Sequence, residues 1–212
     1  MSKYSTKLYA EFQGTQIRGG AKMKRVEQKE KRRQEILNKA LDLFIQKGYS
    51  ATKTAEIAKA VGMSEGLLFH YFATKERLYL ALLQTAVSGK DNIFELKNVT
   101  PLRFFEETAK TILDYIIKEP FAAKLFVLMN RAKYEAVLSE EIRDYLLRQK
   151  DIEYATSLIT QGQQDGTIRE GNPLALATAF FMAIQGIAEN IARNPEMPPP
   201  KPDWIVDIIR NK

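Results

Sequence analysis

The segment from Thr54 to Lys75 has the residue types and the spacing of a helix-turn-helix, whose chemistry is the recognition of DNA. Its first short helix places three apolar residues on one face: Ile57, Ala58 and Val61. Gly62 follows where the chain must turn sharply, and glycine tolerates the positive φ that such a turn often needs. Thr54 and Ser64 are the predicted N-caps of the two helices. The second helix of such a motif can lie in the major groove of DNA.

Catalysis is the alternative chemistry, and the sequence lacks the groups that it needs. The chain has no cysteine, so it offers no thiolate nucleophile, no disulfide and no cysteine metal site. His70 is the single histidine, and no nucleophile–base pair can be built around it. The glycines between Gly14 and Gly20 lack the lysine of a phosphate-binding loop. We therefore predict that the chain is not an enzyme and holds no catalytic residue, metal or cofactor.

The charge of the chain is distributed unevenly. The whole sequence has a formal net charge of +6, but residues 22–77 alone carry 13 basic and 7 acidic side chains. Residues 78–212 carry 16 basic and 18 acidic side chains, a net charge of −2. A basic surface around the motif is the electrostatic footprint of phosphate binding, although a solvated lysine-rich helix has the same composition. Charge and motif together favour DNA as a partner.

Composition also bears on where the protein acts. The sequence has no visible secretory signal and no run of about 18 apolar residues, the length that would predict a membrane span. Residues 174–187 form an apolar stretch that is too short and contains Thr178 and Gln185. We therefore expect a cytoplasmic protein that makes no use of a membrane.

Helical periodicity extends over nearly the whole chain, and no strand pattern rises above it. Apolar residues recur at helical spacing over residues 24–47 and 74–96, on either side of the helix-turn-helix. Longer helices follow residue 98, with predicted starts at Pro101, Pro120, Ser139 (one helix that ends near Gly166), Pro173 and just before Trp204. The predicted fold is all-α, with about nine helices.

Three parts of the chain are predicted from these patterns. Residues 1–22 lack apolar periodicity and read as a leader or a disordered arm. Residues 23–77 form the DNA-binding domain with the helix-turn-helix. Residues 78–212 form a larger helical domain.

Residues 33–78 resemble the N-terminal domain of the TetR family of bacterial transcriptional repressors. The resemblance is carried by Ile36-Leu37, Ala40, Phe44, Gly48-Tyr49, Thr52, Ile57-Ala58, Gly62, Ser64, Gly66, Leu68, Tyr71-Phe72, Lys75-Glu76 and Leu78. The later helices agree with that family in number and length only. The resemblance implies that residues 78–212 bind an effector and form a dimer.

The resemblance also implies which residues contact DNA: Lys53, Thr54, Ala55, Glu65, Gly66, Leu67, Phe69, His70, Tyr71 and Lys75. Thr54, Tyr71 and Lys75 would contact phosphates, whereas most of the others would face base edges or the groove wall. Glu65 has a second interpretation, since a carboxylate also complements a helix N-terminus. Two positions depart from the family pattern. Phe69 replaces the usual tyrosine and lacks its hydroxyl group, and Leu67 replaces an often polar residue, which favours contact with a thymine methyl group.

The helix that starts at Pro173 is apolar nearly all round, so it must be buried on more than one side. Small residues on this helix, with neighbours from the last helix, form the predicted homodimer interface: Ala175, Ala179, Ala183, Gly186, Asn190, Trp204 and Ile208. Such a dimer would place two recognition helices on successive major grooves, about 34–36 Å apart.

An effector pocket is predicted among large residues of the second domain: Phe104, Phe105, Tyr115, Phe126, Met129, Tyr154, Phe181 and Gln185. An apolar lining favours a small hydrophobic effector. Any helical bundle needs large core residues, however, so each of these side chains could instead fill a core.

The sequence therefore predicts a ligand-responsive transcriptional regulator, most simply a repressor. It would bind a palindromic double-stranded DNA operator as a homodimer and be released by a small molecule. The alternative is a helical adaptor protein without specific DNA binding.

Overall fold

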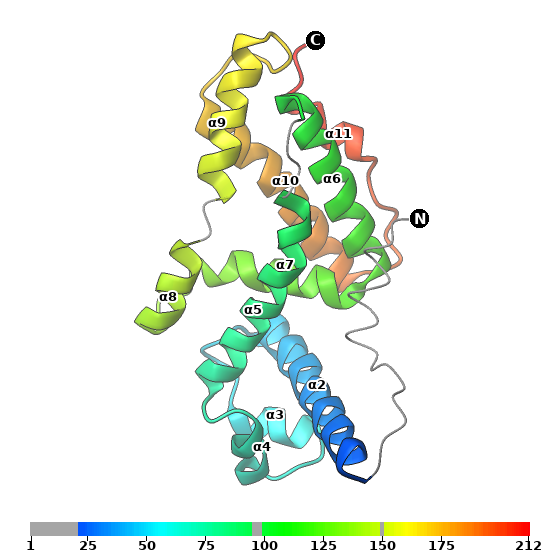
Figure 1. The fold of residues 1–212 in the computed structure, drawn as a ribbon, viewed down its shortest axis with the longest axis vertical. Helices are drawn as coiled ribbons and strands as arrows, with labels where there is room; N and C mark the ends of the chain where they lie inside the picture. The colour runs from blue at the N-terminus through cyan, green and yellow to red at the C-terminus, as the bar shows by residue number, and fades with distance from the viewer. Residues whose placement is uncertain (1–20, 95–98, 149–150) are drawn as a thin grey trace.

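The computed structural model describes residues 21–94, 99–148 and 151–212, and most of the predicted leader, residues 1–20, lies outside them. The described residues are mostly helical (Figure 1). The helices are α2 (Ala21–Lys47), α3 (Thr54–Ala60), α4 (Glu65–Tyr71), α5 (Lys75–Phe94), α6 (Pro101–Lys118), α7 (Pro120–Ala132), α8 (Glu140–Leu147), α9 (Asp151–Gln164), α10 (Pro173–Arg193) and α11 (Pro202–Val206). The all-α prediction is confirmed.

Local capping signals explain where several helices begin. The Ser64 hydroxyl accepts a hydrogen bond from the backbone N–H of Leu67 at 3.2 Å, and Asn172 caps α10 in the same way through Ala175 at 3.0 Å. The predicted N-cap at Thr54 is wrong, because Thr54 is the first residue of α3. Lys53 is the N-cap, and its backbone N–H donates to the Glu56 carboxylate at 3.1 Å. Hydrogen bonds from Lys47 and from the Lys53 backbone lower the pKa of Glu56.

Two hydrophobic cores hold the helices together. The first core lies among α2, α3, α4 and α5 and also receives side chains from α7 and α8; Phe44, Leu68 and Leu82 are among its buried members. The second core lies among α6, α7, α9, α10 and α11, around Phe105 and Phe180. Figure 1 shows the first set of helices in the lower part of the molecule, with α7 crossing the middle. Since α7 contributes to both cores, it is the main packing link between them.

The long helix predicted from Ser139 to near Gly166 is wrong. The structure has two helices there, because α8 ends at Leu147 and α9 begins at Asp151. The side chains explain the division. Leu146 of α8 is buried in the first core, whereas Leu158 of α9 is buried in the second. Hydrophobic spacing is the same in both helices, so periodicity could not show that the chain changes cores between them.

Helix α10 packs against α6, α7, α9 and α11. Ala177, Phe180 and Ile184 are fully buried on its inner side, whereas Ala175, Ala179 and Gly186 are exposed on the opposite side. Within the single chain α10 is therefore buried on one side, and the prediction of burial on more than one side is wrong there. By length and composition α10 is also the one described helix that could cross a membrane. Core helices that are mostly buried meet the same criterion, whereas 28% of the apolar window of α10 is buried in the structure.

Candidate nucleic-acid interface

Helix α4 is anchored by one residue and leaves most of its side chains in solvent. Leu68 is 1% exposed and packs into the first core. Five of the predicted DNA-binding residues are exposed on this helix: Glu65, Gly66, Leu67, Phe69 and His70. Leu67 and Phe69 are 45% and 42% exposed, an unusual position for large apolar side chains on so short a helix. Exposed apolar side chains grouped in this way are typical of a contact surface.

The turn before α4 has the geometry that the sequence predicts. Gly62 has a φ of +65°, so a side chain there would strain the backbone. Arg32 of α2 stabilises the same turn by donating to the Val61 carbonyl at 2.7 Å, while its other terminal nitrogen lies 2.6 Å from Glu35. Sequence reasoning missed this role, because no local pattern joins residues 29 positions apart.

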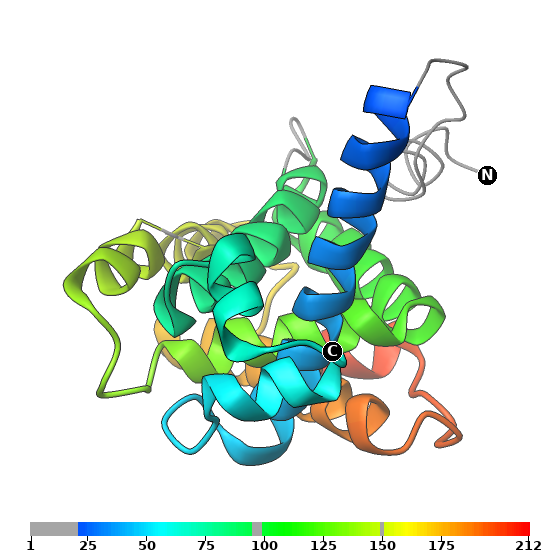
Figure 2. The same ribbon diagram turned by 90° about the horizontal axis from the view of Figure 1, so that it is seen from below.

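The starts of α3 and α4 lie beside each other. The Thr54 hydroxyl donates a hydrogen bond to the Glu65 carboxylate, which fixes the first turn of α4 against that of α3. An open cleft at this place is lined by Ser50, Thr52, Lys53, Thr54, Ala55, Glu65 and Lys75. The structure thus brings together five of the predicted DNA-binding residues on one surface, and α4 adds the rest beside it. Figure 2 shows α3 and α4 at this end of the molecule.

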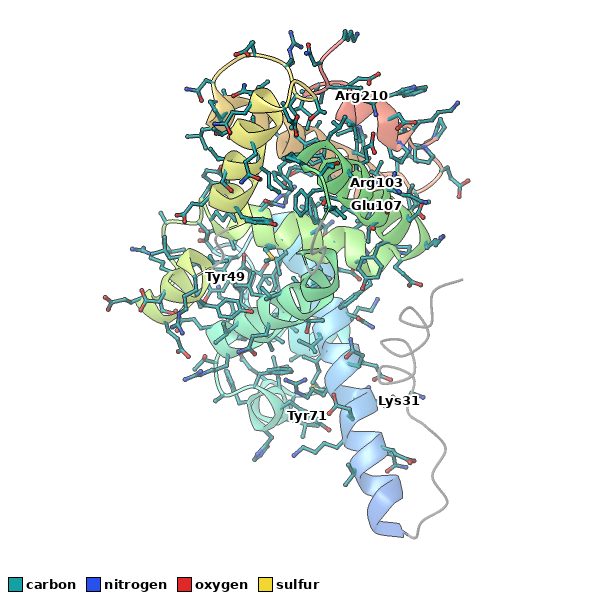
Figure 3. All side chains as sticks on the ribbon, turned by 45° about the horizontal axis from the view of Figure 1, so that its top comes forward. Lys31, Tyr49, Tyr71, Arg103, Glu107 and Arg210 are labelled. Carbon is teal, nitrogen blue, oxygen red and sulfur yellow. The ribbon has the colours of Figure 1, made fainter. Side chains whose placement is uncertain are left out.

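Tyr71 completes this surface at the end of α4. Its side chain is half-buried against the first core. In the view of Figure 3, Tyr71 and Lys31 lie on opposite sides of α2, and both are far from Arg103 and Arg210 at the other end of the molecule. A tyrosine that packs on the protein and remains partly exposed suits a phosphate contact.

Lys75 lies in this surface, but its ammonium group is already bonded within the protein. Its Nζ donates to the carbonyls of Tyr49 and Thr52 at 2.9 Å and 3.0 Å and lies 4.3 Å from the centre of the Tyr49 ring. Lys75 therefore fixes the loop that carries Lys53 and Thr54.

Aromatic side chains of the first core pack against Tyr49, which lies in the loop between α2 and α3. The Tyr79 ring lies 5.1 Å from that of Phe44 and 4.7 Å from that of Tyr49, both close to edge-on. Burial, with Glu76 and Glu135 nearby, raises the pKa of Tyr49 to about 12, and burial also raises the pKa of Tyr79. Both phenols are therefore neutral at physiological pH.

We expect Lys75→Met to lower the free energy of unfolding by about 1–3 kcal/mol, because two carbonyls lose a charged donor. The same variant should bind all DNA sequences more weakly, since the loop with Lys53 and Thr54 loosens. Chemical denaturation and DNA titration measure the two effects. Lys59→Met, at an exposed position of α3, is the matched control and should change stability by less than about 0.5 kcal/mol. Equal stability of both variants would contradict the conclusion that Lys75 fixes this loop.

The predicted pocket residues do not all come together. Phe104 and Phe105 are fully buried in the second core, and the Tyr154 ring lies 5.5 Å from that of Phe104. Phe180, which was not predicted, joins Phe105 and Phe181 at ring distances of 5.0 Å and 5.2 Å. The remaining predicted residues divide as follows: Phe126 and Gln185 are half-buried, Tyr115 is 40% exposed, and Met129 lies in the first core. Met129 therefore packs apart from the aromatic group.

The predicted interface residues of α10 share its outer side. Four are exposed and Ala183 is half-buried; the exposed four are Ala175, Ala179, Gly186 and Asn190. Met182 lies on the same side and is 43% exposed. Trp204 of α11 is 62% exposed, whereas Ile208 is half-buried against the second core. An apolar face of small residues is thus open along α10.

Comparison with known proteins agrees with this geometry. A family model described as bacterial regulatory proteins, tetR family, matches residues 36–82. The chain is 30% identical over 161 residues to YvkB, an HTH-type transcriptional regulator of Bacillus subtilis, over 71% of this chain and 78% of YvkB. It is 27% identical over 157 residues to the HTH-type transcriptional regulator RutR of Escherichia coli, over 73% and 72% of the two chains.

The fold is also found among solved structures. AibR in complex with isovaleryl coenzyme A and operator DNA is similar with a TM-score of 0.62 at 20% identity, over 83% of this chain and 94% of AibR. The relatives named here are regulators of transcription and not enzymes. The matched helix-turn-helix and the relatives that extend along most of the chain lead to one conclusion: this protein belongs to the TetR family of bacterial transcriptional regulators.

Proposed function

We propose that the protein is a cytoplasmic repressor that binds a palindromic DNA operator as a homodimer and leaves it when a small molecule binds. The observation that carries this proposal is the exposed face of α4, with Leu67, Phe69 and His70 in solvent beside the cleft at Thr54. In this proposal residues 23–77 read the DNA, and residues 78–212 bind the effector and form the dimer.

The outer face of α10 supports the homodimer. Its exposed small residues let two copies of the helix approach closely around a two-fold axis, and such an isologous contact closes on itself. Two copies of α4 would then meet successive major grooves about 34–36 Å apart. One seven-residue recognition helix reads few base pairs, so two are needed for a specific operator.

Two buried polar atoms of the second domain support an effector site. Thr108 Oγ1 and Gln185 Oε1 are both buried and have no hydrogen-bond partner among the described residues. An unpaired buried oxygen is costly, so each is a candidate acceptor for a ligand. The aromatic side chains of the second core favour a small hydrophobic effector. AibR, which has a similar fold, was solved with isovaleryl coenzyme A.

The sequence preference of DNA binding tests the role of α4. We expect His70→Ala to reduce discrimination at one base position by about 1–3 kcal/mol, because a base-edge contact is lost. Tyr71→Phe should instead weaken binding to all sequences, since a phosphate contact carries no sequence information. Titrations of matched and mismatched duplexes at fixed salt measure both.

A loss of affinity from His70→Ala that is the same for every sequence would contradict base reading by α4. Lys59→Ala is the control, because Lys59 is exposed on α3 outside the predicted contact set. Absence of sequence preference in the unchanged protein would favour the adaptor alternative.

A further inference from the structure

Arg131, at the end of α7, joins α2 to α10. Its Nη1 donates to the carbonyl of Ile45 at 2.9 Å, in the last turn of α2. Its Nε lies 3.5 Å from Glu189 Oε1 on α10. The last four carbonyls of a helix have no partner within the helix, and a cation at that end is favourable. A half-buried guanidinium with two fixed partners is a directional link between these helices.

The partner on α10 is itself held in place. Gln185 Nε2, one turn earlier, lies 3.3 Å from the same Glu189 oxygen, and Arg193 Nη2 lies 3.7 Å from the other oxygen. Glu189 lies beside exposed Asn190, on the helix whose outer face is the proposed dimer interface. Through its contacts to Glu189 and to the Ile45 carbonyl, Arg131 therefore connects a residue near the proposed interface with the last turn of α2.

Helix α2 carries this connection into the DNA-reading half. Ile45 packs against both hydrophobic cores, and Arg32 of the same helix bonds to the turn before α4. A second ion pair between α7 and α2, from Lys124 Nζ to Asp42 Oδ1 at 2.6 Å, lies two turns before Arg131. Among the polar contacts of the described residues, Lys124 and Arg131 both join α7 to α2, and the one at Arg131 also extends to Glu189 of α10.

We infer that Arg131 and Glu189 are positioning residues that set the distance between the two DNA-reading halves of a dimer, and thereby the spacing of operator half-sites. The inference rests on the proposed homodimer. In that dimer α10 defines the two-fold axis, and Arg131 fixes the orientation of α2 relative to that axis. Helix α4 follows the orientation of α2, because Arg32 of α2 bonds to the turn before α4. Neither residue touches DNA.

The test uses duplexes that carry an operator selected from random DNA, with the segment between half-sites unchanged, shortened by one base pair or lengthened by one. The full-length protein should prefer one spacing. Arg131→Met keeps the length of the side chain and removes both contacts. We expect it to bind the preferred spacing about 2- to 30-fold more weakly and the altered spacings nearly as before, so the spacing preference falls.

Arg193→Met is the matched control. This variant removes the second arginine that contacts the Glu189 carboxylate, but it breaks no contact to α2. Its spacing preference should therefore be the same as that of the unchanged protein. Glu189→Gln keeps the size of the side chain and should reduce the preference in the same direction as Arg131→Met. Thermal unfolding checks that each variant is folded. If Arg131→Met is unfolded, the result for Glu189→Gln decides the test.

An unchanged spacing preference in Arg131→Met or, where that variant unfolds, in Glu189→Gln would overturn the inference and leave the proposed function intact. An equal loss in Arg193→Met would overturn it as well. If the unchanged protein had no preferred spacing, the proposed dimer on a palindrome would fall, and the inference with it.

Discussion

Ala179→Glu should make the protein monomeric and lower its operator affinity by about 100- to 10,000-fold, the gain that joining two binding sites usually gives. Ala179 is exposed on the outer face of α10, between Ala175 and Ala183. In the proposed dimer this face is covered by its own copy. Glutamate there would bury an unpaired carboxylate, which is costly.

Light scattering measures the oligomeric state, and titration of the selected operator measures the affinity. Ala136→Glu is the matched control, because Ala136 is an exposed alanine between α7 and α8. It should remain dimeric and bind the operator as before. A dimeric Ala179→Glu protein with normal operator affinity would place the interface elsewhere.

Phe180→Ala should lower the free energy of unfolding by about 3–5 kcal/mol, the usual cost of removing a fully buried phenylalanine ring. Phe180 is 0% exposed, and its ring contacts those of Phe105 and Phe181. The loss combines lost burial with a cavity that the helices cannot close. Denaturant unfolding at one fixed protein concentration measures it, since the proposed dimer would make stability depend on concentration.

Phe69→Ala is the control with the same chemical change. Phe69 is 42% exposed on α4, so its removal should change stability by less than about 1 kcal/mol while weakening DNA binding. If both variants lost the same stability, Phe180 would not be the central residue of the second core.

Local signals in the sequence were enough to predict the turn and the second helix of the helix-turn-helix. The turn at Gly62 and the N-cap at Ser64 depend on residues close in the chain, and both are confirmed. Hydrophobicity alone could not show that Leu67 and Phe69 are exposed, because both are apolar neighbours of the buried Leu68. Thr54 shows the limit of such signals, since its hydroxyl bonds to Glu65 across the motif and does not cap α3.

Features that depend on tertiary packing could not be predicted in the same way. Met129 has the character of a pocket residue in sequence, but α7 contributes to both cores and Met129 faces the first. The sequence predicted a DNA contact for Lys75 but could not show its bonds to two carbonyls more than 20 residues away. The link from Arg131 to Ile45 spans 86 positions and has no counterpart in any local pattern.

The most direct test of the proposed function is selection of randomised duplex DNA by the purified protein, followed by sequencing of the retained duplexes. We predict a palindromic consensus whose half-sites lie one helical turn apart, or a multiple of it, as two copies of α4 related by a two-fold axis require. Retention of DNA without any consensus, or a consensus with a single half-site, would contradict a homodimer that reads an operator through α4.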